Sequence, residues 1–453
     1  MKKSDVVRPP EISVGFVSLG CPKNLVDTQT MAGVLMENGL TLAPSPEAAD
    51  VIIVNTCAFI EEARKEAIDS IFSACELKIT GRCKAVLVAG CLPQRYKDDL
   101  VEELPEVDGF IGLDDLRAVA RITRAVAAGK SGLAEISPRS KRVFDPPVPG
   151  LVLTGGAYAY LKIAEGCNHR CTFCAIPSIR GRHRSRSEKK IVAEAEGLLA
   201  AGVKELVLVS QDVTAYGQDR NTDLAALLRK LARLGEGFWI RWLYGFPSRV
   251  NVKLLETMAA LPQVCRYLDV PIQHSHPDIL RNMGRAATAG QLERMVSRIR
   301  RIMPDASLRT TCLVGFPGEK DAHFRHLLAF VTRMQFDHLG VFPFSPEEDT
   351  PAEQMPGRPS RRAAERRRDQ LMQAQGRIVT EKAQDLVDTE TTVLLEQQMD
   401  DRTWLGRAYR DAPEIDGAVL VEHTPDLQAG QFVRARYTAQ AGYDMKASVM
   451  AEA

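Results

Sequence analysis

The fold is decided by the stretch Ala164-Glu165-Gly166-Cys167-Asn168-His169-Arg170-Cys171-Thr172-Phe173-Cys174, which places three cysteines at Cys-x₃-Cys-x₂-Cys spacing. Three thiolates on one short loop can hold three corners of an iron–sulfur cube, because soft sulfur ligands select such iron sites. No fourth cysteine stands nearby, so one iron is left open to a small molecule, as is typical of a reactive metal site. The alternatives are three unrelated thiols or a zinc site with His169 as the fourth ligand, and zinc is disfavoured because His169 lies inside the loop.

Length and composition set the class of protein. The chain has 453 residues, enough for about three domains of ordinary size. Lys and Arg number 59 and Asp and Glu number 58, so the total charge indicates neither nucleic acid nor membrane as a partner. The start of the chain lacks the apolar core of a signal peptide, and no apolar run is long enough to span a membrane. A cytoplasmic protein is predicted, whose ten cysteines are metal ligands or redox groups rather than disulfides.

Residues 12–136 alternate short apolar runs with longer amphipathic ones. This pattern predicts a small doubly wound α/β domain with a parallel sheet. The expected strands are Val14–Ser18, Val51–Val54 and Ala85–Ala89, and the expected helices are Val26–Asn38, Ile60–Cys75 and Gln94–Glu103.

Cys21, Cys57 and Cys91 each follow the carboxyl end of one of these strands. Ligands of open α/β sheets bind at that edge, and neighbouring strands lie about 5 Å apart. Three loops there could therefore bring three thiolates together, although any single one could also be a buried, inert cysteine. The other cysteines lack such placement and are interpreted as structural; they are Cys75, Cys83, Cys265 and Cys312.

A proline-rich linker, predicted over residues 137–152, precedes a second alternation of strands and helices over residues 153–385. The linker contains Pro138, Pro146, Pro147 and Pro149. Six strands are expected, at Tyr158–Ala164, Glu205–Ser210, Trp239–Tyr244, Tyr267–Ile272, Ser307–Val314 and Leu339–Phe344. Six repeats predict a partial (β/α)₆ TIM-like barrel followed by a helical connector. Function in such barrels lies on the loops after the strands, and the cysteine loop follows the first strand.

Residues 386–453 contain short alternating runs that predict a small antiparallel β-barrel of the oligonucleotide-binding class; the runs are Thr391–Leu395, Ala418–Val421 and Phe432–Tyr437. They carry twelve acidic and six basic residues, a balance of −6. A domain that grips phosphates should be basic, so this one is expected to attract a basic protein instead.

The cysteine loop resembles the signature of the radical S-adenosylmethionine (SAM) superfamily. The resemblance implies a 4Fe–4S cluster whose open iron binds SAM and splits it into methionine and a deoxyadenosyl radical. It also implies that the loop after the second strand, Ser210-Gln211-Asp212, meets the amino group of SAM, and that Gly315 and Phe316 flank its adenosine. The sequence departs from the commoner Gly-Gly-Glu at the first of these places. The basic stretch Arg180–Arg186 is a candidate to hold the SAM carboxylate or an acidic substrate group.

Taken together, the three regions resemble a radical SAM methylthiotransferase with a TRAM-like terminal domain. Within that family, Ser18–Asn24 and Asp411–Gly417 resemble the ribosomal-protein (RimO-type) branch, whereas the tRNA branch usually has Tyr-Gly-Cys-Gln-Met-Asn at the first cysteine. The implied reaction adds a methylthio group to the β-carbon of an aspartate in small-subunit ribosomal protein twelve. The resemblance assigns Cys167, Cys171 and Cys174 to the radical-generating cluster, and Cys21, Cys57 and Cys91 to an auxiliary 4Fe–4S cluster that takes part in sulfur transfer.

The expected partners are a basic ribosomal protein, a reducing electron donor such as flavodoxin or ferredoxin, and a sulfur source, with no membrane and no direct nucleic acid. Two other functions stay open at this point. The same chemistry could act on a tRNA adenosine, or the chain could be a non-catalytic iron–sulfur or RNA-binding protein.

Overall fold

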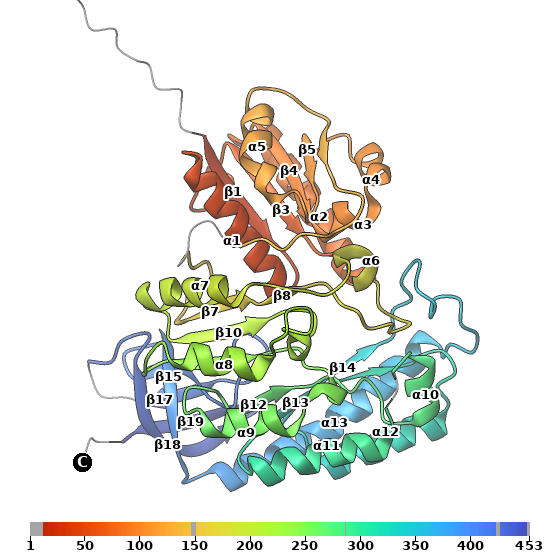
Figure 1. Ribbon diagram of the computed structural model, residues 1–453, viewed down its shortest axis with the longest axis vertical. Coiled ribbons are helices and arrows are strands. Elements are labelled where there is room, and N and C mark those ends of the chain that lie inside the picture. Colours follow the sequence, from red (N-terminus) through yellow and green to blue (C-terminus); the bar gives the residue numbers. More distant parts are fainter. Residues whose placement is uncertain (1–11, 146–150, 286, 423–425, 451–453) are drawn as a thin grey trace, which may run out of the picture. The chain divides into compact units, whose positions relative to one another are not determined.

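The computed structural model describes residues 12–145, 151–285, 287–422 and 426–450 (Figure 1). The chain divides into two compact units: the first runs to Leu153 and adds Glu165–Cys167 and Ala175–Arg182, and the second contains the remainder. Two parts of the sequence analysis lie outside the described residues. They are the linker prolines Pro146, Pro147 and Pro149 and the beginning of the chain, where no signal peptide was expected. Of the helices described, none is long and apolar enough to cross a membrane.

The first unit contains a parallel sheet in the order β2-β1-β3-β4-β5-β6. Its strands are β1 (Ser13–Ser18), β2 (Thr41–Leu42), β3 (Val51–Thr56), β4 (Ala85–Gly90), β5 (Gly109–Ile111) and β6 (Leu133–Glu135). Alternate residues of β3 face opposite cores: Ile52 and Val54 pack with α2 (Glu61–Thr80), while Val51 and Ile53 pack with α1 (Pro22–Glu37) and α5 (Val119–Ala127). Helices therefore cover both faces, which confirms the predicted doubly wound domain.

Local differences from the predicted elements have simple causes. Helix α1 begins at Pro22, directly after Cys21, because the fixed φ of proline suits the first helical position. The predicted charged helix is two short helices, α3 (Cys91–Tyr96) and α4 (Asp98–Glu103), separated at Lys97, whose φ is 49°. Strands β2, β5 and β6 have two or three residues each, too few to show a period-2 pattern.

The second unit begins with six parallel strands arranged as two sheets, β11-β10-β7 and β12-β13-β14. The strands are β7 (Tyr158–Lys162), β10 (Glu205–Val209), β11 (Trp239–Trp242), β12 (Tyr267–Asp269), β13 (Ser307–Val314) and β14 (His338–Pro343). The helices between them are α7 (Glu188–Ala200), α8 (Leu224–Ala232), α9 (Val252–Ala260), α10 (Pro277–Asn282), α11 (Ala289–Ile302) and α12 (Asp321–Met334). An isolated parallel bridge joins Ile240 of β11 to Val264, three residues before β12 begins. The predicted partial barrel is confirmed.

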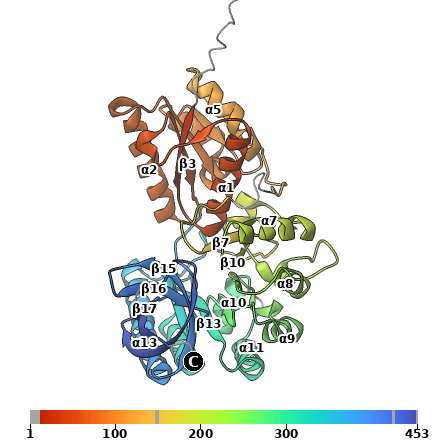
Figure 2. The same cartoon turned by 90° about the vertical axis from the view of Figure 1, so that its left-hand side faces the viewer.

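Helix α13 (Arg361–Leu386) leads to a closed barrel in the order β15-β16-β17-β19-β18, drawn in blue in Figure 2. Its strands are β15 (Glu390–Gln398), β16 (Thr403–Ala408), β17 (Val419–Glu422), β18 (Phe432–Ala441) and β19 (Asp444–Val449). The pairings are antiparallel except that of β17 with β19, which is parallel. Strands β16 and β19 were not among the predicted runs.

The segment Asp411–Gly417 of this terminal barrel contacts the first residues of the partial-barrel strands, within the second unit. Tyr158 and Tyr160 donate their hydroxyls to Glu414 at 2.6 and 2.9 Å, and Tyr267 donates to Asp416 at 2.6 Å. The carboxylates of Glu414 and Asp416 therefore form hydrogen bonds at the amino ends of the strands. The chemistry of such barrels takes place at the opposite edge.

Candidate cluster-binding sites

Cys21, Cys57 and Cys91 lie at one edge of the first unit's sheet. Strands β1, β3 and β4 are direct neighbours, with Ser18 opposite Asn55 and Asn55 opposite Ala89. Cys57 and Cys91 are the first residues after β3 and β4, and Cys21 follows β1 by three residues. The parallel register thus brings the three strand ends, each with its cysteine, to the same carboxyl edge.

Two of the sulfur atoms face one amide oxygen. The Oδ1 atom of Asn24 lies 3.8 Å from the Sγ of Cys21 and 3.7 Å from the Sγ of Cys91. Cys57 borders Gly20: a Cβ atom at Gly20 would lie 2.6 Å from the Cβ of Cys57 and 3.1 Å from its Sγ. The three cysteines are thus packed around the Gly20–Asn24 turn, and their donor set fits three ligands of an iron–sulfur cluster.

Asn24 is fixed by the backbone at the strand ends. It is fully buried, and its Nδ2 donates to the carbonyl oxygens of Leu19 at 3.0 Å and Thr56 at 2.9 Å. The Nδ2 of Asn55 donates in turn to the carbonyl oxygen of Asn24 at 2.7 Å. Because both amide hydrogens are engaged, Oδ1 is oriented toward the sulfurs.

A buried arginine completes the surroundings of Cys91. Arg180, only 1% exposed, lies 3.3 Å from the Sγ of Cys91 through Nη2. The same Nη2 lies 2.6 Å from Asn24 Oδ1 and 2.9 Å from Asp27, while Nη1 donates to Glu165 at 3.0 Å. Sequence reasoning missed this group because Arg180 and Asn24 are 156 positions apart.

Burial and charge act on the three thiols in opposite directions. Burial raises the pKa of Cys91 to about 12 despite the nearby Arg180, and it also raises the pKa of Cys57. At Cys21 burial has the same tendency, but the charges of Lys23 and Arg180 outweigh it and lower the pKa. A metal ligand must be a thiolate, so a bound metal would supply the positive charge that the deprotonation of these buried sulfurs requires.

The Cys167–Cys174 loop is held at both ends. In the first unit, Cys167 donates its backbone N–H to Gly181 at 3.0 Å, and a Cβ at Gly166 would come within 2.2 Å of the carbonyl oxygen of Arg182. In the second unit, Cys174 donates to the carbonyl oxygen of Cys171 at 3.2 Å. All three cysteines are half-buried.

The segment between Cys167 and Cys174 contacts residues that follow β10, β11 and β13. His169 lies 2.7 Å from a carboxylate oxygen of Asp212 through Nε2 and stacks on Phe246, with ring centroids 3.6 Å apart. Phe173 packs edge-on against Phe316, which is fully buried. Since its Nε2 atom contacts a carboxylate, His169 is poorly placed to serve as a zinc ligand through that atom.

The residues expected to contact SAM lie after two strands of the second unit. Ser210 directly follows β10 and is fully buried, and among the described residues its hydroxyl has no hydrogen-bond partner. Gln211 and Asp212 come next, and the Asp212 carboxylate also lies 3.3 Å from Arg249. Gly315 follows β13 with a φ of 75° and donates its N–H to Glu319. An unpartnered buried hydroxyl fits a polar ligand at this end of the barrel.

The basic stretch Arg180–Arg186, suggested by the sequence for the SAM carboxylate, is instead paired within the protein at both ends. Arg186 is 2% exposed and forms an ion pair with Glu194 at 2.6 Å, and Arg180 is held as described above.

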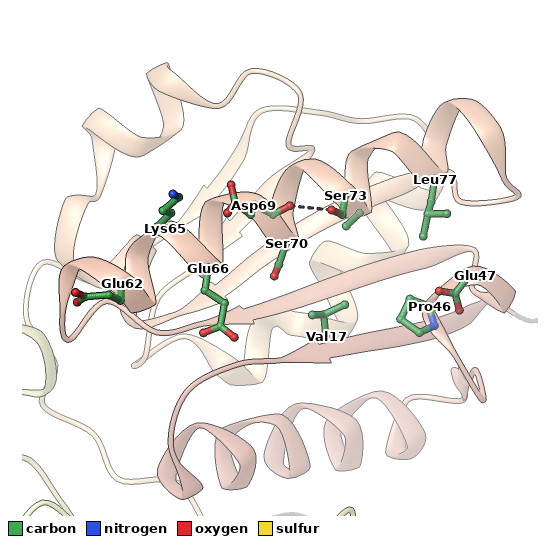
Figure 3. A pocket seen from close by; sticks show the side chains of 11 residues that line it. Val17, Pro46, Glu47, Glu62, Lys65, Glu66, Asp69, Ser70, Ser73 and Leu77 are labelled. Carbon is green, nitrogen blue, oxygen red and sulfur yellow. Dashed lines mark hydrogen bonds between the residues drawn. The ribbon is translucent and has the colours of Figure 1, made fainter. Parts of the chain in front are cut away.

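A groove of about 650 Å³ in the first unit runs along α2 (Figure 3). Among the described residues, those that line it include none of the six candidate cysteines; they are Val17, Pro46, Glu47, Glu62, Lys65, Glu66, Asp69, Ser70, Ser73, Ala74 and Leu77. This groove is therefore separate from the candidate cluster ligands.

Three protein-family models match the chain. They are the Uncharacterized protein family UPF0004 over residues 13–112, the Radical SAM superfamily over residues 161–331, and the TRAM domain over residues 387–450. Among solved structures, the radical S-adenosylmethionine methyltransferase TsrM from Kitasatospora setae, with cobalamin and a [4Fe-4S] cluster bound, has a TM-score of 0.56 and 13% identity. The match covers 76% of this chain and 74% of that one, and it shows likeness of fold alone.

The fold and the cysteine loop thus define a radical SAM enzyme. The curated relatives narrow the class. Ribosomal protein uS12 methylthiotransferase RimO of Syntrophus aciditrophicus (strain SB) is 45% identical, over 97% of this chain and 99% of that relative. The protein of the same name in Trichlorobacter lovleyi is 43% identical, over 97% of this chain and 98% of its own. The chain belongs to the family of ribosomal protein uS12 methylthiotransferases.

Proposed function

We propose that this enzyme transfers a methylthio group to ribosomal protein uS12, as the names of its relatives suggest, and that the group is placed on the β-carbon of an aspartate. The observation that carries the proposal is the gathering of Cys21, Cys57 and Cys91 at neighbouring strand ends, around the Asn24 amide. A radical SAM enzyme that only abstracts hydrogen needs one cluster. Sulfur insertion also needs a source of sulfur at the site, and a second set of three thiolates could hold the cluster that takes part in this step.

Each group of residues has one task in this proposal. Cys167, Cys171 and Cys174 would hold the radical-generating 4Fe–4S cluster, and Cys21, Cys57 and Cys91 the auxiliary 4Fe–4S cluster. When bound, the clusters and SAM supply the one-electron cleavage, the sulfur and the methyl group that no side chain provides. The protein supplies the thiolate ligands and their orientation.

The residues after β10 and β13 are proposed to bind SAM. Ser210 offers a buried hydroxyl and Gln211 an amide, while Gly315 and Phe316 form the turn after β13. Asp212 is proposed to bind the SAM amino group, and its contacts with His169 and Arg249 connect that site to the cysteine loop.

The reaction needs a radical because the β-hydrogen of an aspartate is too weakly acidic to be removed as a proton by a side-chain base.

The terminal barrel supports a basic protein as substrate. Five charged residues of this domain contact the partial barrel: Asp411, Glu414, Asp416, Arg407 and Arg410. Without them, residues 386–453 contain nine acidic and four basic side chains. The excess of negative charge would attract a basic ribosomal protein and repel RNA.

We also propose that the enzyme needs a reducing electron donor, such as flavodoxin or ferredoxin, and a separate sulfur source. We propose a cytoplasmic location and domain limits at residues 12–136, 153–385 and 386–453.

The test is anaerobic reconstitution of the full chain with iron and sulfide, followed by turnover with SAM, a reductant and either uS12 or tRNA. Wild type should bind about eight irons, four for each cluster, and mass spectrometry should find the methylthio group on a uS12 aspartate. Methylthio on tRNA alone would overturn the substrate.

Three cysteine variants separate the two proposed clusters. Cys174→Ala should lose both SAM cleavage and methylthio transfer, because it removes a ligand of the radical-generating cluster. Cys57→Ala should keep SAM cleavage and lose transfer. Cys75→Ala, on α2 and outside both sets, is the matched control and should retain both activities. Equal loss of cleavage in Cys57→Ala and Cys174→Ala would contradict the division of roles.

A further inference from the structure

We propose that Arg180 is a positioning residue of the auxiliary cluster, which sets the reduction potential of that cluster through its charge and its contact with the Cys91 sulfur. The inference rests on the proposed function, because it requires that Cys21, Cys57 and Cys91 hold iron. It assigns a task to a residue that is not a cluster ligand and whose guanidinium is paired inside the first unit, although the sequence suggested it for the SAM carboxylate.

The geometry leaves the guanidinium little freedom. Arg180 is 1% exposed and contacts four groups through its two terminal nitrogens, namely Cys91, Asn24, Asp27 and Glu165. Asp27 and Glu165 are themselves 1% and 6% exposed. The planar fork of an arginine suits such a multidentate site, and a lysine offers only a single ammonium.

The charge acts where water cannot screen it. Reduction of a cluster adds one negative charge, and a fixed cation 3.3 Å from a ligand sulfur stabilises the more negative state. Hydrogen bonds to ligand sulfurs are among the features that set iron–sulfur potentials. Removal of the cation should therefore make the auxiliary cluster harder to reduce.

Arg180 also lies on the segment of chain that follows the Cys167–Cys174 loop. Arg180 ends α6 (Ile176–Arg180), a short helix that begins two residues after Cys174 and belongs to the first unit. Ala175 and Ile179 of this segment pack in the core that contains Cys91. One segment therefore leads from the ligand loop of one proposed cluster to the ligand surroundings of the other.

The test uses the full chain with Cys167, Cys171 and Cys174 all replaced by Ala, so that the remaining cluster is reported alone. Iron content is measured first, and the midpoint potential is then measured by dithionite titration followed by electron paramagnetic resonance. In this background Arg180→Gln should lower the equilibrium constant for one-electron reduction about tenfold, a shift of about 59 mV to lower potential. Arg180→Lys keeps the charge and should lie between Arg180→Gln and the parent.

Arg241→Gln is the matched control. Arg241 is also fully buried and pairs with a carboxylate, that of Glu205 at 2.6 Å, but in the second unit. Its loss should leave the potential unchanged, which separates a general effect of removing a buried arginine from an effect on the cluster.

The outcomes separate the two proposals. A parent that binds no iron would overturn the proposed function. If the parent, Arg180→Lys and Arg180→Gln all bind about four irons and share one midpoint potential, the proposed role of Arg180 is refuted while the proposed function stands. If Arg180→Gln does not fold, the lysine variant decides: an unshifted potential then refutes the inference, because lysine cannot reproduce the contacts of the fork.

Discussion

Gly20→Ala should remove the auxiliary cluster while leaving the cysteine loop of the barrel intact. Gly20 has a φ of 90°, and an alanine in such a left-handed conformation costs about 1–2 kcal/mol. The new Cβ would lie 2.6 Å from the Cβ of Cys57, whereas carbon atoms in contact are about 3.5–4.0 Å apart. Cys57 would have to move by roughly 1 Å, at an overpacking cost of about 1–3 kcal/mol.

The two costs predict a loss of about 2–5 kcal/mol in the free energy of unfolding, taken as their sum. The displacement matters more for function, because metal–ligand distances tolerate only about 0.2 Å. The variant should therefore retain about four of about eight irons after anaerobic reconstitution. The assay is iron and sulfide content per chain, together with urea unfolding followed by circular dichroism.

Gly39→Ala is the control for backbone strain. Gly39 has a φ of 70°, and a Cβ there would meet nothing within 4 Å among the described residues. It should lose only the 1–2 kcal/mol of the left-handed conformation and keep both clusters. If Gly20→Ala bound iron as well as Gly39→Ala and was equally stable, the packing of Cys57 against the Gly20 turn would not be what places that ligand.

Three further predictions concern the second unit. Tyr267→Phe removes the hydroxyl that donates to the buried Asp416 and should cost about 1–3 kcal/mol in urea unfolding, whereas Tyr443→Phe, at a side chain 56% exposed, should cost almost nothing. Burial raises the pKa of Asp411 from 3.8 to about 6, so this carboxyl favours folding below its ordinary pKa and loses that contribution as pH rises through 6. Asp411→Asn should therefore raise the melting temperature at pH 8 and leave it nearly unchanged at pH 4; an equal rise at both would contradict the assignment. Asp212→Asn weakens the hold on His169 and should slow SAM cleavage at least tenfold with iron content unchanged, and normal cleavage would show that this contact is dispensable.

The arrangement of strands could be predicted from the sequence because it depends on local periodicity and on a general rule. Alternating strands and helices predict parallel sheets, and the carboxyl ends of parallel strands share an edge. That rule alone placed Cys21, Cys57 and Cys91 together, and the register of β1, β3 and β4 puts their strand ends side by side. Strands of only two or three residues, such as β2 and β5, were not predicted.

Side-chain pairing over long separations could not be predicted, because it leaves no periodic signal. The basic stretch after the cysteine loop suggested exposed cations for a SAM carboxylate, yet Arg180 and Arg186 are buried in ion pairs. The Asp411–Gly417 stretch carried part of the family resemblance without any indication of its structural task, which is to bind the amino ends of the barrel strands through Glu414 and Asp416.

The sulfur of Cys91, a proposed cluster ligand, has polar neighbours that differ from those of Cys312, a cysteine interpreted as structural. Cys312 is fully buried on β13, and burial raises the pKa of its thiol. Cys91 is almost as buried, but its sulfur faces the guanidinium of Arg180 and the amide oxygen of Asn24. Arg180 already pairs with Asp27 and Glu165, and a neutral thiol adds little to such a group because it is only a weak acceptor. The same groups are useful beside a metal thiolate, whose charge they orient and balance. The polar surroundings therefore support a metal-binding role for this cysteine independently of sequence similarity.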